Sequence, residues 1–231
     1  MSTHYVIRSF DRADPEVISG LRNAGVATVH EAYGRRGLMD PGIRPIQTDH
    51  AVAGSAVTVL CPPGDNMMIH AALEVVQPGD LLVVTTTSPS TDGMFGDLLA
   101  TSLMAQGGVG LVIEAGVRDT SVLRSMGFPV WSRAIHSQGT VKATAGSVNV
   151  PIVCADAAVE PGDVVVADDD GVVVVSRSDA SKTLDAANAR LEKETATREN
   201  LESGALSLDF YGFRGRLEDL GVSWVDNQED L

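Results

Sequence analysis

The stretch that decides the fold is GMFGDLLATSLMAQGGVGLVIEAGVRDT, residues 93–120. Its first half, FGDLLATSLMAQ, has the apolar spacing of a helix, and a glycine-rich break then leads into VGLVI, a run typical of a buried strand. The next segment, EAGVRD, is expected to be a loop that carries Arg118 and Asp119. Open α/β sheets bind ligands just beyond the carboxyl ends of their strands. This order of elements therefore predicts an α/β fold with a candidate site in that loop.

The flanking sequence continues the alternation of strands and helices. Residues 54–62 read as a strand and 65–76 as a helix. Residues 77–87 read as a turn followed by a nearly continuous apolar strand, which is typical of a strand covered on both faces. The phrase EPGDVVVADDDGVVVV, residues 160–175, predicts a hairpin with an Asp-Gly turn. Several short strands are expected over 133–153. The fold class is therefore α/β, a compact layered sandwich with mixed sheets.

We expect one domain over residues 1–231. It would comprise N-terminal helices in 1–50, an α/β core in 51–176 and a C-terminal helical extension in 177–225. The extension begins with a long helix whose faces are charged except for a narrow apolar stripe. The stripe consists of Leu184, Ala187, Leu191 and Leu201. A stripe of this kind often packs on a neighbouring subunit, so we expect a homo-oligomer.

Composition excludes several classes of partner. The chain has 231 residues, 44% of them hydrophobic, which is typical of a globular protein, and a formal net charge of −14. That charge disfavours nucleic acid and anionic membranes as partners. No apolar run reaches the roughly 20 residues of a membrane helix and no signal-peptide core is visible, so a cytoplasmic protein is expected. Cys61 and Cys154 lie in apolar runs and are expected to be free, buried thiols.

The residues around the central stretch suggest a site for a keto acid and a cation. Asp97 lies where a glycine-led turn enters a helix, and the amides of Leu98 and Leu99 belong to its first turn, where a carboxylate can bind. Arg118 can hold a keto acid, and Asp119 can hold a hard divalent cation. A structural interpretation stays open, in which Asp97 is a helix cap and Arg118 with Asp119 a surface ion pair.

Few residues could support other chemistry. Lysine occurs only at positions 142, 182 and 193, and the last two lie on the charged helix, so a Schiff-base mechanism would depend on Lys142. Carboxylates are abundant, which favours metal-assisted enolate chemistry. The histidines show no spacing typical of metal ligands; they are His4, His30, His50, His70 and His136. No Walker motif, nucleophile elbow or zincin motif is present.

The sequence as a whole resembles the class II pyruvate aldolases, which cleave 4-hydroxy-4-methyl-2-oxoglutarate and 4-carboxy-4-hydroxy-2-oxoadipate and are relatives of the regulator of ribonuclease activity A. The resemblance covers nearly the whole chain and is carried by an ordered set of motifs: TVHEAYGRRGLMDPGIRPI, PPGDNMMIHAALEVVQPGD, DGMFGDLLATS, EAGVRD, GFPVWSR, VNVPIVCADAAVEPGDVVVADDDGVVVV, EKETATR and SLDFYGFRGRLEDLGVSWVD. It implies a fold similar to the swivelling phosphohistidine domain, assembled as a homotrimer or homohexamer.

The resemblance also implies roles for the residues of the central stretch. Asp119 matches the direct ligand of Mg²⁺ or Mn²⁺, and Arg118 matches the arginine that contacts the pyruvate oxygen. Asp97 matches a carboxylate that reaches the metal through water. Leu98 and Leu99 match residues whose backbone amides bind the pyruvate carboxylate.

Further site residues are implied outside the central motifs or at their margin. Gly96 is implied as a substrate-binding position at the helix start. Asn66, His70 and Lys142 are implied as contacts to the distal part of the substrate. Glu194, in the motif E-K-E-x-x-x-R, is the match to an acidic residue that a neighbouring subunit donates to the metal, although Glu192 lies two residues away.

The implied activity is retro-aldol cleavage of 4-hydroxy-2-oxo acids in aromatic-compound degradation, with oxaloacetate decarboxylation as a companion activity. The regulator branch of the family typically lacks the aspartate of F-G-D-L-L-A, and Asp97 is present here, which favours the enzyme. The alternative is a non-catalytic, protein-binding trimer like the ribonuclease regulators. A methyltransferase is disfavoured because no glycine-rich cofactor loop follows a first strand.

Overall fold

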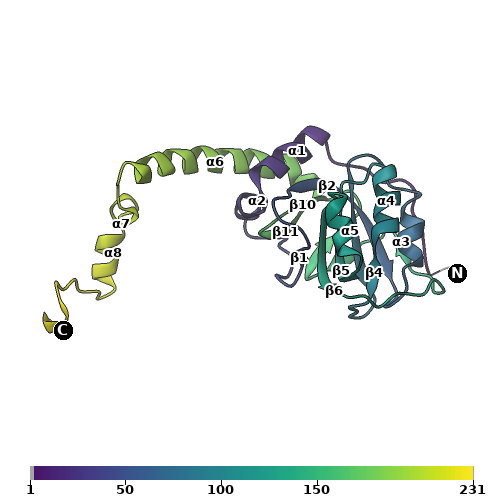
Figure 1. Cartoon of the computed structure of the whole chain (residues 1–231). Coiled ribbons are helices and arrows are strands. Elements are labelled where there is room, and N and C mark those ends of the chain that lie inside the picture. Colours follow the sequence, from purple (N-terminus) through teal and green to yellow (C-terminus); the bar gives the residue numbers. More distant parts are fainter. Residues whose placement is uncertain (1–2, 231) are drawn as a thin grey trace. The chain divides into compact units, whose positions relative to one another are not determined.

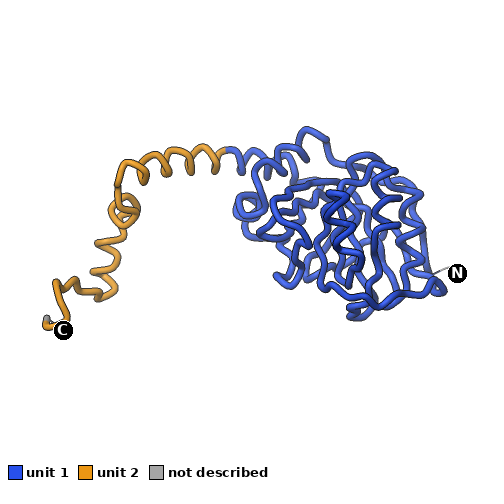
Figure 2. Tube along the Cα trace, in the orientation of Figure 1, with its two compact units in different colours: residues 1–188 blue, residues 189–231 orange. Residues whose placement is uncertain are grey.

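The computed structural model describes residues 3–230 of the chain (Figure 1). The chain divides into two compact units, Met1–Asn188 and Ala189–Leu231 (Figure 2). The first unit holds the sheet and its covering helices, and the second holds the end of the long helix and two short ones.

The helices of the structure are α1 (Pro15–Ala24), α2 (Val26–Ala32), α3 (Met67–Ala72), α4 (Asp97–Ala105), α5 (Thr120–Ser125), α6 (Ala180–Glu202), α7 (Ser207–Phe210) and α8 (Phe213–Asp219). The strands are β1 (Arg44–Pro45), β2 (Val52–Cys61), β3 (Asp80–Thr86), β4 (Gly93–Phe95), β5 (Gly110–Val117), β6 (Val130–Ile135), β7 (Ser147–Val148), β8 (Ile152–Cys154), β9 (Ala157–Val159), β10 (Val164–Asp168) and β11 (Gly171–Val175). Two short 3₁₀ helices span Arg177–Asp179 and Gln228–Asp230.

The main sheet is mixed, as the sequence predicts. Its strand order is β1-β6-β5-β3-β2-β10-β11, with β4 paired to β5 and β7 paired to β2. Strands β2, β3, β5 and β6 pair in parallel, whereas β10 and β11 form the predicted antiparallel hairpin beside β2. Strands β8 and β9 form a separate two-stranded ribbon. The predicted α/β class with mixed sheets is confirmed.

The two ends of the main sheet are brought together by the segment 37–45. Leu38 bridges Val173 of β11, and further along the same segment β1 pairs with β6. The indole of Trp131 in β6 also donates a hydrogen bond of 2.8 Å to the carbonyl of Asp168 at the end of β10. The sheet therefore curls into a nearly closed structure with two different faces.

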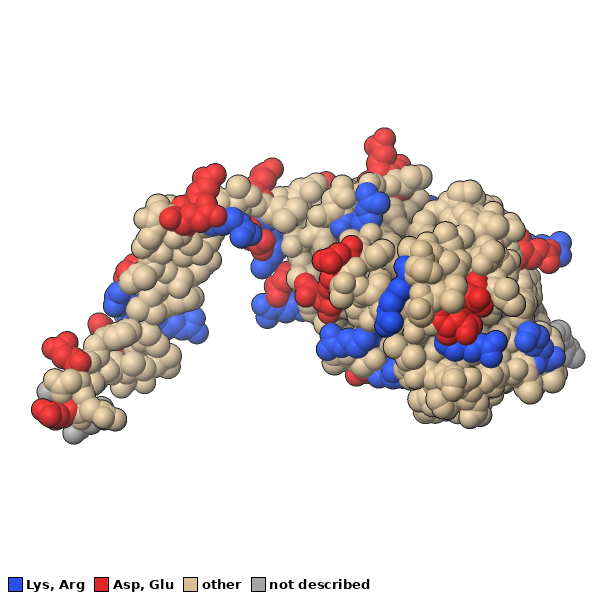
Figure 3. Space-filling model, viewed as in Figure 1, with Lys and Arg blue, Asp and Glu red and all other residues tan. Residues whose placement is uncertain are grey.

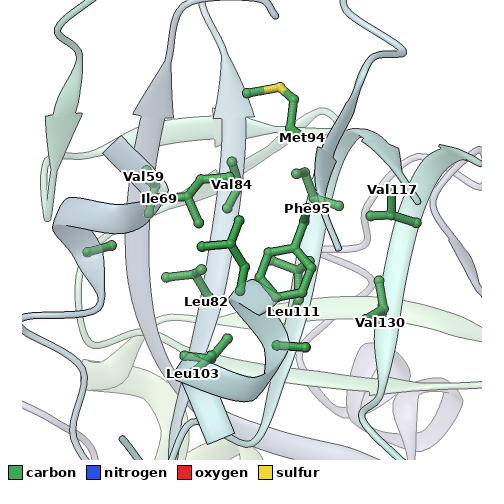
Figure 4. Packing of buried hydrophobic residues seen from close by; sticks show 14 of the residues in the cluster. Val59, Ile69, Leu82, Val84, Met94, Phe95, Leu103, Leu111, Val117 and Val130 are labelled. Carbon is green, nitrogen blue, oxygen red and sulfur yellow. The ribbon is translucent and has the colours of Figure 1, made fainter. Parts of the chain in front are cut away.

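Successive side chains of the strands point to opposite faces of the sheet. On one face, Leu82 of β3 and Leu111 of β5 pack with Ile69 of α3 and Leu103 of α4 (Figure 4). On the other face, the curled sheet encloses a second apolar cluster around the buried Trp131, to which the β8-β9 ribbon contributes. Because strand side chains alternate in direction, both faces of the central strands are buried, which accounts for their continuous apolar sequence.

Several local predictions are confirmed in detail. Helix α1 begins with Pro15, and the side chain of Asp14 accepts a hydrogen bond of 2.8 Å from the amide of Glu16, as a helix cap does. Cys61 and Cys154 are free and buried. Burial and the nearby charge of Asp65 raise the pKa of the Cys61 thiol to about 12.

Other local predictions differ from the structure. Residues 114–117, expected in a loop, continue β5, because Gly116 of β5 pairs with Gly93 of β4. A side chain on Gly116 would meet the carbonyl of Thr91 at 2.0 Å, so only glycine lets the two segments approach this closely. The helix expected over 65–76 is confined to α3, which spans Met67–Ala72.

Within residues 189–229, the second unit has no buried residue. Tyr211 stacks on Phe213 and meets Phe210 edge-on, and Arg214 pairs with Asp209. Exposed apolar side chains in this unit are Leu201, Leu206, Phe210, Tyr211, Phe213, Leu220, Val222, Trp224 and Val225. Among residues 3–230, no helix has both the length and the apolar run needed to cross a membrane.

Candidate active site

Residues from four separate segments surround one pocket beyond the carboxyl ends of β4 and β5. The pocket has a volume of about 140 Å³. It is lined by Asn66, His70, Gly93, Met94, Gly96, Asp97, Leu98, Leu99, Arg118, Asp119 and Lys142. The structure thus brings together every predicted site residue except Glu194, whose proposed place is in a neighbouring subunit.

The first wall of the pocket is the start of α4. Gly96 is the residue before the helix, and Asp97 is its first residue, so Asp97 does not occupy the capping position itself. The carboxylate of Asp97 accepts a hydrogen bond of 2.8 Å from the amide of Leu98. The amide of Leu99 lies in the first turn, where helical amides have no carbonyl four residues back. This helix start offers hydrogen-bond donors to an anion.

Asp119 faces this helix start from the end of β5. Its backbone is in the left-handed region, with φ +57°, and its carbonyl accepts hydrogen bonds from Val122 and Leu123 in the first turn of α5. Its side chain accepts a hydrogen bond of 3.4 Å from the amide of Asp97. A non-glycine residue in the left-handed region is uncommon and tends to occur at functional sites.

Gly96 is required by the close approach of Asp119. A Cβ atom on Gly96 would lie 2.3 Å from the nearer carboxylate oxygen of Asp119 and 3.2 Å from Cγ of Arg118. The glycine therefore lets the two segments meet, which gives it a role in shaping the site. This role differs from the substrate contact expected from the sequence, which stays a prediction.

Arg118 is fixed through its backbone and has a half-exposed side chain. Its amide donates a hydrogen bond of 2.9 Å to the carbonyl of Phe95, while its side chain is 48% exposed. Nε of Arg118 lies 3.5 Å from Oδ2 of Asp119, so the ion pair of the structural interpretation is present. An exposed pair of this kind is weak, and the guanidinium retains donors for a ligand.

The opposite wall is formed by α3 and the loop that carries Lys142. The buried carboxylate of Asp65 accepts hydrogen bonds of 2.7 Å from the amides of Ala143 and Thr144 and one of 2.9 Å from the amide of Met67. Burial opposes the charge of Asp65, but these hydrogen bonds outweigh it and lower the pKa of the carboxyl group. Asp65 therefore holds the Lys142 loop against α3.

Asp65 is a site-building residue that the sequence analysis missed. Its position two residues before a helix is a signal for a short-range backbone contact to Met67. Its other partners are backbone amides 78 and 79 residues away, and such contacts leave no pattern of side chains in a sequence.

His70 is part of α3 and lines the pocket. Partial burial and the positive charge of Lys142 lower the pKa of its imidazole. This shift favours the neutral imidazole, and the cationic side chains that line the pocket are Arg118 and Lys142.

The donor set of the pocket fits Mg²⁺ or Mn²⁺. Asp97 and Asp119 present carboxylates to the same cavity. Within residues 3–230, no three Asp, Glu, His or Cys side chains form a complete cage for a metal. Mg²⁺ needs no such cage, because it usually keeps several waters and binds one or two carboxylates together with its substrate. On the face shown in Figure 3, acidic and basic side chains are interspersed.

Glu194 lies in the second unit, on α6. Its carboxylate accepts a hydrogen bond of 2.8 Å from Nε of Arg190. Its contribution to a neighbouring subunit's metal site stays a prediction.

A larger cavity, of about 620 Å³, is lined by the hydroxyl-rich segment Thr85–Thr91 together with Glu114, Arg133 and Val153. Arg133 is already paired with Asp40, at 2.5 Å, and with Glu114, at 3.2 Å. Its charge is therefore engaged in holding the fold, and this cavity offers a ligand mainly hydroxyl groups.

Fold and site define a class of mixed α/β protein with a carboxylate-lined pocket at the ends of parallel strands. Comparison with known proteins narrows that class: a family model described as "RraA-like: Aldolase/RraA" matches residues 26–174, and the chain belongs to this family.

Some relatives carry the name of an aldolase, and one similar structure carries the name of the RraA family. A protein of Halalkalibacterium halodurans named "Putative 4-hydroxy-4-methyl-2-oxoglutarate aldolase" is 25% identical over 200 residues, covering 87% of this chain and 95% of its own. A Burkholderia multivorans protein of the same name is 32% identical over 147 residues, covering 64% and 89% of the two chains. The crystal structure of Streptomyces coelicolor RraAS2, an unusual member of the RNase ES inhibitor RraA protein family, matches with a TM-score of 0.73 and 31% identity, over 82% of this chain and 99% of that one.

Proposed function

We propose that this protein is a divalent-metal-dependent carbon–carbon lyase. It cleaves 4-hydroxy-2-oxo acids, of the type of 4-hydroxy-4-methyl-2-oxoglutarate and 4-carboxy-4-hydroxy-2-oxoadipate, to pyruvate and a second keto acid. Oxaloacetate decarboxylation is its companion activity. The observation that carries the proposal is the convergence of Asp97, Arg118 and Asp119 on one pocket at a helix start. The aldolase names of two relatives support it.

The carboxylates supply the cation site. Asp119 would hold Mg²⁺ or Mn²⁺ directly, Asp97 through a water molecule, and Glu194 would approach from a neighbouring subunit. A bound cation polarises the 2-keto oxygen and stabilises negative charge on it.

The other residues bind the pyruvyl end of the substrate and stabilise the charge that develops there. The amide of Leu99 at the start of α4, and that of Leu98 once the Asp97 carboxylate releases it, would bind the C1 carboxylate. The water held by Asp97 takes the proton of the C4 hydroxyl, and the electron pair of the C3–C4 bond moves onto the pyruvyl fragment. Arg118 donates to the 2-keto oxygen as negative charge develops on it. Protonation at C3 then gives pyruvate.

The same arrangement explains the companion reaction. In oxaloacetate the C3–C4 bond breaks with departure of CO₂, and its electrons move to the same oxygen beside Arg118. Lys142 and His70, which also line the pocket, would bind the distal carboxylate of a longer substrate.

The test is pyruvate release, coupled to a dehydrogenase, from oxaloacetate and from 4-carboxy-4-hydroxy-2-oxoadipate. We expect turnover that EDTA abolishes and Mg²⁺ or Mn²⁺ restores. Borohydride added with pyruvate should leave no adduct on the protein, because Lys142 would bind a carboxylate rather than form a Schiff base. Trapping at Lys142, or metal-independent turnover, would overturn the mechanism.

A second candidate is a protein-binding regulator, favoured by the likeness to RraAS2 and its family. Absence of pyruvate from every hydroxy-keto acid, together with a stable protein complex isolated with the folded chain, would select it. For the enzyme we expect a homotrimer or homohexamer that acts in the cytoplasm, within aromatic-compound degradation. Light scattering measures the oligomeric state. The ratio of the turnover rates on the different substrates tests the pathway.

A further inference from the structure

The side chain of Arg118 lies against three glycine residues along its length. A Cβ atom on Gly93 would lie 3.2 Å from Cβ of Arg118, and a Cβ atom on Gly96 would lie 3.2 Å from its Cγ. A Cβ atom on Gly139 would lie 3.0 Å from Nη1, at the far end of the side chain. These distances are shorter than most contacts of a real Cβ atom. The arginine therefore depends, for its position, on the absence of side chains at all three places.

The third glycine belongs to a separate segment, residues 136–142, which we call the strap. The carbonyl of Gln138 accepts a hydrogen bond of 2.8 Å from the amide that begins β4. On the other side of Gly139, the amide of Val141 donates a hydrogen bond of 3.0 Å to the carbonyl of Gly64, in the loop before α3. Backbone hydrogen bonds therefore hold the strap both before and after Gly139.

A side chain at position 139 would displace Arg118 and leave the strap in place. The backbone of Gly139 is outside the left-handed region, so an alanine fits its conformation. The atom that this alanine would meet is the end of a long, flexible side chain that is 48% exposed. Moving that end costs less than breaking the hydrogen bonds of the strap. The substitution therefore acts on the guanidinium and spares the fold.

Gly139 and Asp119 together locate the guanidinium of Arg118. Nε lies 3.5 Å from Oδ2 of Asp119, and Nη1 faces Gly139. Two of the three nitrogens thus have neighbours that fix them, and the remaining N–H donors can face a ligand. Displacement of a catalytic group by about 1 Å can lower a rate about 10²-fold, so this placement matters for the reaction.

We propose that Gly139 is a positioning residue for Arg118, and that the strap sets the place of the guanidinium by presenting a backbone without a side chain there. Gly139 acts only through Arg118 and needs no contact with the substrate. This inference rests on the proposed function for the identity of the ligand, which is the pyruvyl end of a keto acid.

The test is a double-mutant cycle that measures binding rather than turnover. The probe is oxalate, a planar dianion with the shape of the pyruvate enolate, and its dissociation constant is measured by calorimetry with the full chain and Mn²⁺. Gly139→Val should weaken oxalate binding by about tenfold, and Gly139→Ala by less. In an Arg118→Ala background, where nothing is left to displace, the same substitutions should change it by less than about twofold.

Kinetics and a control variant give a second readout. On oxaloacetate, Gly139→Val should lower kcat by about tenfold or more in the otherwise native chain, and by less than about twofold in the Arg118→Ala chain. Ser137→Val adds similar bulk at an exposed position of the strap and should leave both oxalate binding and kcat unchanged. Urea unfolding of Gly139→Val should give nearly the parent's free energy of unfolding.

The outcomes separate this inference from the proposed function. Equal losses in the native and Arg118→Ala backgrounds would show that Gly139 maintains the pocket as a whole, and no loss in either would show that Arg118 is placed without it. A parent chain that binds no oxalate, or binds it equally well without Arg118, would also overturn the inference. Losses that require Arg118, in a protein that releases no pyruvate from any hydroxy-keto acid, would support the inference and overturn the lyase.

Discussion

Arg118 is held by its backbone but has a half-exposed side chain, so its removal should affect chemistry more than stability. We expect Arg118→Ala to lower kcat/KM by about 10²–10³-fold, as loss of a donor to a developing oxyanion does. Steady-state kinetics on oxaloacetate measures this. Arg35→Ala, at an exposed arginine that pairs with Glu31, is the control and should leave the rate unchanged. Near-normal turnover of Arg118→Ala would remove Arg118 from the mechanism.

A substitution of Asp119 should weaken metal binding while leaving the stability of the fold nearly unchanged. Asp119→Asn keeps the size of the side chain and removes its charge, so we expect loss of metal-dependent turnover and weaker binding of Mn²⁺ by calorimetry. The melting temperature without metal should stay within a few degrees, because the carbonyl rather than the carboxylate of Asp119 begins α5. An unaltered Mn²⁺ titration would reject Asp119 as a ligand.

Some residues of the site can be predicted from the local sequence pattern, and others cannot. Asp97, Arg118 and Asp119 can be placed from local pattern, because each lies at the junction of a glycine turn or a strand with a helix. Asn66 and Lys142 are expected only from the family resemblance. Their meeting depends on the backbone contacts that Asp65 makes to a distant loop, and no local pattern encodes those contacts.

At the scale of elements, α4 can approach the end of β5 because Gly96 has no side chain. Gly96→Ala would place a Cβ 2.3 Å from the Asp119 carboxylate, so that carboxylate must turn away from the start of α4. We expect a loss of metal-dependent activity of at least about tenfold, since misplaced catalytic groups are costly, with a small change in unfolding free energy. Gly215→Ala, where a Cβ meets no atom within 4 Å, is the control. Normal activity of Gly96→Ala would contradict the required contact.

The junction of α3 with the Lys142 loop depends on a buried charge. Asp65→Ala leaves the amides of Met67, Ala143 and Thr144 without their acceptor, and we expect a loss of about 3 kcal/mol of unfolding free energy at pH 7. Urea unfolding measures it.

The loss should depend on pH. The native pKa of Asp65 is lowered, so its ionised form stabilises the fold above the unfolded pKa and this contribution disappears as the pH falls through the native pKa. The difference between parent and variant should therefore shrink in acid. A difference that grows below pH 4 would contradict this account.

An element that is fixed by neighbouring residues in the sequence can be predicted from the sequence. An element that is fixed by contacts with distant residues cannot. Helix α1 has its cap and proline in adjacent positions, and the β10-β11 hairpin has its own turn, so both are predictable. The extension of β5 to Val117 arises because the end of β6 and β4, a strand of three residues, both pair with it there. A strand that short has no periodicity to recognise.

For the whole molecule, the second unit provides a test of assembly. Trp224 is 59% exposed in the single chain, whereas Trp131 is fully buried in the first unit. If the part of the second unit that contains Trp224 packs on a neighbouring copy, acrylamide should quench neither tryptophan well in the assembled protein. Fluorescence quenching at concentrations where light scattering shows the oligomer measures this, with the unfolded chain in guanidinium as the fully accessible control. An oligomer with one readily quenched tryptophan would place the second unit outside the interface.

The closure of the sheet by residues 37–45 limits how copies of the chain can associate. One outer strand, β11, is covered by backbone hydrogen bonds, from Met39 to the carbonyl of Val172 and from Val174 to the carbonyl of Gly37. The other, β1, has two residues, one of them Pro45, which has no amide hydrogen to donate. Neither margin of the main sheet offers a long row of open backbone groups, so adding a strand from another chain, the usual beginning of amyloid growth, has no template there.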